Sequence, residues 1–167
     1  ATLVIDVFDD GTPSTLINDG TIINTGTYTN SGVLVNNGTI TNSNAINNGG
    51  SIAIEAMGTL STSGTTSNQA TGSITNAGTI TTLELGTFTN AGTITMDTMG
   101  TLSTSGTTNN QATASITNAG TITTLELGTF TNAGTITMDT TGTLSTSGTT
   151  NNQATASITN AGTITTL

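Results

Sequence analysis

An exact internal repeat constrains the fold of this chain more than any other feature. Residues 86–98 have the sequence GTFTNAGTITMDT, and the same letters return forty-two residues later at residues 128–140. The larger unit covers residues 100–141 and starts again at Gly142, and an earlier copy with a few substitutions starts at Gly58. Repeats of this length are typical of solenoids, in which each unit packs only against its neighbours.

Shorter units lie inside and before this repeat. From Asp19 the chain consists of the hexapeptides DGTIIN, TGTYTN, SGVLVN, NGTITN, SNAINN and GGSIAI, and after Gly50 units of six and eight residues alternate. The second position is glycine, or asparagine at Asn44. Because these residues reach positive φ at low cost, each is expected to mark a corner. One apolar residue in six, beside Thr or Val, predicts a short strand with one inward side chain.

The number of strands in one coil has two solutions. Two strands give coils of fourteen residues, and three give alternating coils of twenty and twenty-two. With three faces, the inward residues sort into two aliphatic columns and a third that holds the aromatic residues of the repeats, where large and small side chains alternate. The third column would hold Tyr28, Ile46, Thr66, Phe88, Thr108, Phe130 and Thr150. With two faces, Leu, Ile and Phe mix in one column. This sorting favours three faces.

The predicted fold is therefore all-β: a parallel β-solenoid (β-helix) with three faces and coils of about 18–22 residues. Residues 1–18 do not repeat. There, ATLVIDVF at residues 1–8 predicts a strand and DDGTP at residues 9–13 a turn, and the strand is expected to cap the first coil or to serve as a donor strand for a neighbouring subunit. Residues 19–57 form hexapeptide-type coils, and residues 58–167 form coils with the 42-residue repeat.

Composition excludes several classes of partner. The chain has no Lys, Arg, His or Cys, and its nine carboxylates give a net charge of −9. Nucleic acid and anionic membranes are not expected as partners, because both require cationic groups. Membrane insertion is not expected either, because no apolar run approaches the ~18 residues that a spanning helix needs. Without Lys or Arg the chain has no trypsin site, which suits a protein outside the cell.

Enzymatic chemistry is not predicted, and neither is a cofactor. Only carboxylates, hydroxyls and Tyr28 are left to titrate or to attack a substrate. A carboxylate pair for glycoside hydrolysis is conceivable, but the acids recur with the repeat. Glu55, Asp97 and Asp139 share one offset, as do Glu84 and Glu126. In a three-faced solenoid, equivalent acids lie two coils apart, at ~9.6 Å.

Three further groups are candidates for binding. Asp6, Asp9 and Asp10 are weak candidates for a Ca²⁺ site, with an exposed turn as the alternative. An asparagine precedes Ala-Gly five times, which predicts either a ligand-binding edge or a ladder of asparagines in αL conformation whose amides bond to the next coil. These asparagines are Asn76, Asn90, Asn118, Asn132 and Asn160.

Thr-x-Thr motifs form the third candidate. They occur at Thr79 and Thr81, Thr93 and Thr95, Thr121 and Thr123, and Thr135 and Thr137, each around an inward Ile. Strand alternation turns both Thr side chains outward, and regular Thr arrays on flat solenoid faces look like those of ice-binding proteins. Every face carries Thr or Ser, however, and β-propensity alone also explains the threonines.

Runs such as ITNAGTI and FTNAGTI carry a family resemblance over residues 19–167. They resemble repeats of bacterial secreted β-solenoid adhesins, of the filamentous-haemagglutinin-like and autotransporter passenger kinds. The resemblance implies an exported, extended and adhesive protein. It leads to the expectation of a structural subunit or segment of an extracellular or cell-surface filament or adhesive stalk, with ice binding as the alternative.

The expected partners are other copies of the chain, stacked head to tail, and host or abiotic surfaces. Leu167 holds the place of Leu83 and Leu125, which Glu-Leu-Gly follows, so we expect either an uncapped last coil or a longer solenoid in which the repeat continues. An uncapped coil offers unpaired N–H and C=O groups to another strand. Strand addition by residues 1–8 of the next subunit would then give a filament, because a head-to-tail contact does not close on itself.

Overall fold

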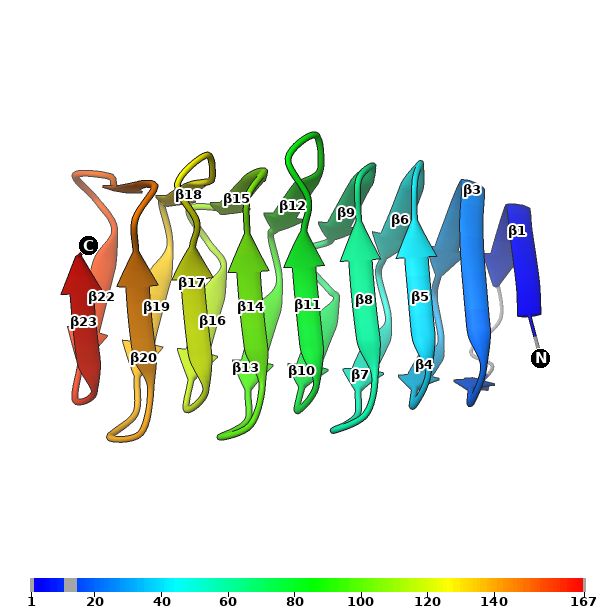
Figure 1. Ribbon diagram of the computed structural model, residues 1–167, viewed down its shortest axis with the longest axis horizontal. Coiled ribbons are helices and arrows are strands. Elements are labelled where there is room, and N and C mark those ends of the chain that lie inside the picture. Colours follow the sequence, from blue (N-terminus) through cyan, green and yellow to red (C-terminus); the bar gives the residue numbers. More distant parts are fainter. Residues whose placement is uncertain (1, 11–14, 167) are drawn as a thin grey trace.

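The chain forms a three-faced parallel β-solenoid of about eight turns (Figure 1). This computed structural model describes the backbone of residues 2–10 and both the backbone and the side chains of residues 15–166. All secondary structure in these ranges is β-strand. Successive strands of one face lie side by side along the solenoid axis, and the two ends of the chain lie at opposite ends of that axis (Figure 1).

Each coil contributes one strand to each face. Face 1 contains the first half of β3 (Thr21–Asn30), β5 (Thr39–Asn42), β8 (Thr59–Thr62), β11 (Thr79–Thr82), β14 (Thr101–Thr104), β17 (Thr121–Thr124), β20 (Thr143–Thr146) and β23 (Thr163–Thr166). Face 2 contains β2 (Thr15–Asn18), β4 (Val33–Asn36), β7 (Ser51–Ile54), β10 (Ser73–Asn76), β13 (Thr93–Met96), β16 (Ser115–Asn118), β19 (Thr135–Met138) and β22 (Ser157–Asn160). Face 3 contains the second half of β3, β6 (Ala45–Asn48), β9 (Thr65–Asn68), β12 (Thr87–Asn90), β15 (Thr107–Asn110), β18 (Thr129–Asn132) and β21 (Thr149–Asn152).

Strand pairing confirms the three-faced coil. β8 pairs with β5 and β11, and β11 pairs in turn with β14, with Leu60, Ile80 and Leu102 in register. A fourteen-residue coil would instead have placed β8 beside β10. Face 3 alternates in size as predicted, because Phe88 lies between Thr66 and Thr108, and Phe130 follows Thr108.

Each strand buries more than the sequence analysis predicted. One inward side chain per strand was expected, but in most strands the second and the fourth residues are both buried. The second residues form the predicted aliphatic and aromatic columns. The fourth residues are Asn, Thr, Ile or Met, and they line the three interior corners of the solenoid. The core therefore contains two aliphatic columns, the mixed column of face 3 and three polar or mixed columns at the corners.

All corners up to Gly50 have two residues, and further along the chain corners of two and four residues alternate on each edge. Two-residue corners such as Ala77–Gly78 alternate with four-residue corners such as Asp97–Gly100, which produces the alternating coil lengths. The expectation of positive φ at these corners is wrong, since no described residue adopts it. Close backbone approach explains the glycines instead. A Cβ added to Gly120 would overlap the carbonyl oxygens of Gly100 and Asp97 in the preceding coil.

The N-terminal strand follows the path of the solenoid. β1 (Thr2–Asp10) pairs in parallel with β3 of its own chain and crosses faces 1 and 3, with Leu3 in register with Ile22 and Phe8 with Tyr28. A register shift between Ile5 and Val7 interrupts the pairing. β1 thus takes the place of a preceding coil on faces 1 and 3. β2 already pairs with β4, so stacked strands begin before the first hexapeptide. The predicted turn at residues 9–13 falls largely outside the described residues.

Candidate functional site

Hydrogen-bonded asparagines run along the interior corner between faces 3 and 2. In this asparagine ladder, the side-chain Nδ2 of each residue donates to Oδ1 of the residue one coil further on, at 2.7–2.9 Å. Its members are Asn30, Asn48, Asn68, Asn90, Asn110, Asn132 and Asn152. Six of the seven are almost completely buried. The ladder therefore adds a continuous side-chain connection to the backbone pairing between coils.

A second bond from the same amides ties neighbouring faces together. Asn90 Nδ2 also donates to the carbonyl oxygen of Ser115, which begins the next strand of face 2 one coil on, at 3.2 Å. Asn110 and Asn132 repeat this bond to Thr135 and Ser157. The bonds between coils all run from an amide to an acceptor one coil closer to the C-terminus, while the Asn68 and Asn90 amides also lie within hydrogen-bond distance of a carbonyl of their own corner, Gly72 and Gly92. The ladder gives the solenoid a chemical polarity.

Four of the five Asn-Ala-Gly asparagines are buried in the interior and do not form a ligand-binding edge. Asn90 and Asn132 belong to the asparagine ladder. Asn76 and Asn118 occupy the interior corner between faces 2 and 1, where the next coil places Met96 and Met138, 3.6 and 3.5 Å from the amide nitrogens. In the same column, Gly78 N–H donates to Asn76 Oδ1. Asn160 lies in the last coil and is exposed. The ladder interpretation of the sequence is confirmed, except that no αL conformation occurs among the described residues.

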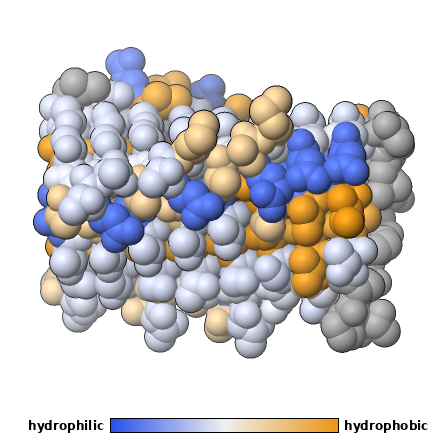
Figure 2. Space-filling view, turned by 90° about the horizontal axis from the view of Figure 1, so that it is seen from below, coloured by the Kyte–Doolittle hydropathy of each residue, from blue (hydrophilic) through white to orange (hydrophobic). Residues whose placement is uncertain are grey.

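The described carboxylates are exposed and lie at the corners. Glu55, Asp97 and Asp139 follow β7, β13 and β19, which alternate with β10 and β16 in the sheet, so equivalent acids lie two coils apart as predicted. Asp19 lies on the same edge, where it accepts a hydrogen bond from Asn37 Nδ2 at 2.7 Å. Figure 2 views this edge, which hydrophilic groups follow in a row.

A metal site remains untested. Among residues 15–166, the acidic side chains form no group of three that could hold a metal ion. The candidate ligands Asp6, Asp9 and Asp10 lie in β1, but their side chains are outside the described ones, so the Ca²⁺ site stays a prediction. The described ranges contain no helix suited to spanning a membrane.

The Thr-x-Thr motifs divide between two faces. Thr79, Thr81, Thr121 and Thr123 lie on face 1, whereas the pairs at residues 93–95 and 135–137 lie on face 2. Strand alternation turns them outward as expected, and all are at least partly accessible.

Face 1 carries an unbroken rank of threonine across eight coils, which the sequence analysis missed. We call it the threonine rank: Thr21, Thr39, Thr59, Thr79, Thr101, Thr121, Thr143 and Thr163. Within it, Thr101 Oγ1 donates to Thr79 Oγ1 at 3.2 Å. In a three-faced register, the threonine rank follows from the first residue of each face 1 strand.

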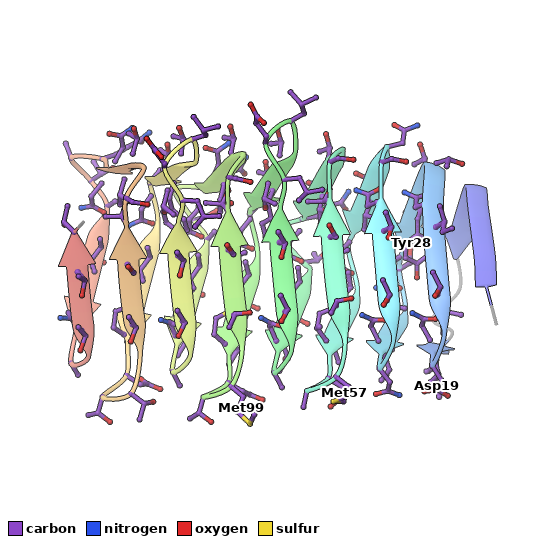
Figure 3. All side chains as sticks on the ribbon, in the orientation of Figure 1. Asp19, Tyr28, Met57 and Met99 are labelled. Carbon is purple, nitrogen blue, oxygen red and sulfur yellow. The ribbon has the colours of Figure 1, made fainter. Side chains whose placement is uncertain are left out.

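Apolar side chains project from two of the three edges. The leucine edge joins face 1 to face 3 and exposes Leu83, Leu85, Leu125 and Leu127. The methionine edge joins face 2 to face 1 and exposes Met57 and Met99 at the bottom of Figure 3. Sequence reasoning placed corners here but overlooked their apolar residues. The signal was Leu-Glu-Leu-Gly, which puts apolar residues outside any strand.

Comparison with known proteins defines no family. No family model matches the chain, and no curated protein matches it. The crystal structure of the TibC-catalyzed hyper-glycosylated TibA55-350 fragment is similar at 14% sequence identity and a TM-score of 0.22, over 99% of this chain and 95% of that chain. A likeness with this TM-score carries no argument on fold or function, so both rest on the geometry described above.

Proposed function

We propose that this chain is a structural segment of an extracellular or cell-surface filament or adhesive stalk, extended by head-to-tail stacking of coils. The observation that carries the proposal is the uniform interface between coils. Backbone pairing, apolar columns and the asparagine ladder recur from coil to coil with donors pointing one way. A surface that matches its neighbour within the chain also matches an equivalent coil of another copy, and such a contact propagates.

A structural role also fits the chemistry of the described residues. Their carboxylates lie apart at exposed corners, and the polar groups of the interior bond mainly to each other. We therefore propose a non-enzymatic protein. Its location outside the cell is proposed from the composition and from the resemblance of its repeats to secreted adhesins.

Size measurement and electron microscopy of the 167-residue chain test the stacking. We expect particles that lengthen with protein concentration. Ile164→Asp, which puts a charge at an inward position of β23, should block growth, because inward charges protect edge strands from pairing. Thr165→Asp, at the outward neighbour, is the matched control and should still assemble. A chain that stays monomeric at high concentration, with or without residues 1–10, would rule out the homopolymer.

Ice binding is the second candidate, and the threonine rank favours it. Eight threonines at ~4.8 Å spacing present a regular array of methyl and hydroxyl groups. Thermal hysteresis and inhibition of ice recrystallisation are the measurements. Thr79→Lys with Thr121→Lys on face 1 should abolish an activity that Thr87→Lys with Thr129→Lys on face 3 leaves intact. Absence of activity in the unaltered chain removes this candidate.

A further inference from the structure

The leucine edge exposes four large apolar side chains among the described residues. Leu85 and Leu127 are 88% and 70% exposed, and Leu83 and Leu125 lie beside them at 41% and 42%. Isolated exposed leucines are ordinary, but these four repeat with the 42-residue unit and stand on one line parallel to the solenoid axis. An apolar row of this kind marks an interaction surface.

The corners give this edge a regular relief. The four-residue corners at residues 83–86 and 125–128 project from the body of the solenoid, as the loops at the top of Figure 1 show. Between them lies a two-residue corner, Ser105–Gly106, with no apolar side chain. Equivalent leucines are therefore two coils apart, or ~9.6 Å.

Charge decides what kind of molecule fits. Glu84 and Glu126 are exposed between the leucines of their corners. The chain has no Lys, Arg or His, so a second copy would set carboxylate against carboxylate with no cation to compensate. Anionic lipid is disfavoured for the same reason. The complementary occupant carries apolar groups and positive charge together.

Spacing decides the conformation of the occupant. Seven residues of an α-helix rise ~10.5 Å and return to the same side, which is close to the ~9.6 Å between the two corners. In an extended strand, side chains on one side recur every ~6.6 Å, so the second of them lies ~13 Å away and neither matches the corner spacing. We propose that the leucine edge binds a basic amphipathic helix that lies along the solenoid axis, with apolar residues on both leucine corners and Lys or Arg beside Glu84 and Glu126. The proposal does not depend on filament formation.

A synthetic probe tests this directly. The probe is a fluorescent three-heptad peptide with Leu at positions a and d and Lys at e and g, and its binding is followed by anisotropy. We expect saturable binding that weakens with salt, because exposed ion pairs are screened. A peptide of the same composition in scrambled order should bind at least tenfold more weakly. Equal binding of the scrambled peptide would reduce the effect to general charge attraction and overturn the proposal.

Paired variants locate the surface. Leu85→Ser with Leu127→Ser should weaken binding at least tenfold, and Glu84→Gln with Glu126→Gln should weaken it and flatten its salt dependence. Met57→Ser with Met99→Ser, on the methionine edge, is the matched control and should have no effect. Equal loss on both edges, or no loss in the leucine variant, contradicts the proposal.

Two measurements protect the test against misfolded variants and against a lipid ligand. Hydrogen exchange of the unaltered chain should show protection by the probe at residues 83–86 and 125–128, and protection elsewhere alone would overturn the proposal. Phosphatidylcholine vesicles should not bind the chain. Vesicle binding that Leu85→Ser with Leu127→Ser abolishes would replace the helix by a lipid surface.

Discussion

Asn90 donates a hydrogen bond from Nδ2 to Oδ1 of Asn110, twenty residues on and one coil away, at 2.9 Å. Both side chains are 1% exposed. Asn110 in turn donates to Asn132 Oδ1 and to the carbonyl oxygen of Thr135. Asparagine suits this position because its amide offers an acceptor on one side and two donors on the other.

Asn110→Asp should destabilise the chain strongly. The introduced carboxylate still accepts from Asn90, but it faces the oxygens of Asn132 and Thr135 without a hydrogen to donate. A buried charge without compensation costs about 3–5 kcal/mol. Asn109→Asp, at the partly exposed outward neighbour, should change stability by less than about 0.5 kcal/mol. Urea denaturation followed by circular dichroism compares the two.

The pH dependence of stability provides a second test of the Asn110→Asp variant. Burial and the facing oxygens raise the folded-state pKa of the introduced carboxyl above its unfolded value of about 3.9. The deficit of Asn110→Asp relative to the unaltered chain should therefore be small below about pH 4 and should grow as the pH rises through the raised pKa. A deficit independent of pH would show that lost packing, and not charge, is responsible.

The inward columns could be predicted from sequence because stacking brings equivalent positions of successive coils into register. Assigning Phe88 and Thr108 to one column already selected three faces. The buried asparagines were harder to place. Asn90 and Asn109 have the same chemistry, and only strand bounds accurate to one residue show that the first is inward and the second outward. A one-residue error in register reverses the two sides of a strand.

The role of glycine was misjudged for a related reason. The glycines do lie at corners as predicted, but the predicted reason, positive φ, is wrong. The contact that requires Gly50 is with Gly32, eighteen residues away. Local sequence patterns do not reveal contacts between residues of different coils. The leucine edge was missed likewise, because alignment of Leu85 with Leu127 depends on the coil length.

Gly49 and Gly50 provide a matched test of close approach. Neither has positive φ. A Cβ at Gly50 would overlap the Gly32 carbonyl oxygen, whereas at Gly49 the nearest atom is the mobile end of Gln69, at 3.1 Å. Gly50→Ala should cost about 1–3 kcal/mol, as overpacking does, and Gly49→Ala should cost less than about 0.5 kcal/mol. Equal losses of stability in thermal denaturation of the two variants would show that backbone conformation, and not close approach, requires glycine.

Core and corner substitutions should differ sharply. Ile94 and Ile116 are stacked on each other and 1% exposed, so either Ile→Ala change should cost about 2–5 kcal/mol. Asp97→Asn, at the exposed corner, should be neutral or slightly stabilising because it removes a negative charge. Urea midpoints measure all three. A loss at Asp97 as large as that at Ile94 would indicate a bound cation.

Two threonines of one interior column should respond oppositely to the same substitution. Thr62 and Thr104 are both completely buried at the corner between faces 1 and 3. Thr62 Oγ1 accepts a hydrogen bond from Asn42 Nδ2 at 3.0 Å, whereas Thr104 Oγ1 has no partner among the described residues. A buried hydroxyl without a partner costs about 1–3 kcal/mol, and valine has nearly the same shape.

Thr104→Val should therefore stabilise the chain by about 1 kcal/mol, and Thr62→Val should destabilise it by up to about 1 kcal/mol, because Asn42 then keeps the Thr65 carbonyl oxygen and only the more distant Thr66 Oγ1, at 3.3 Å, as acceptors. Urea denaturation at one protein concentration, below that at which the chain assembles, keeps stacking out of the comparison. Hydrogen exchange at the following strands, β9 and β15, shows whether each effect stays local. Equal changes at both sites would mean that the Thr104 hydroxyl is satisfied in solution, and the interior corner would then be hydrated along its length.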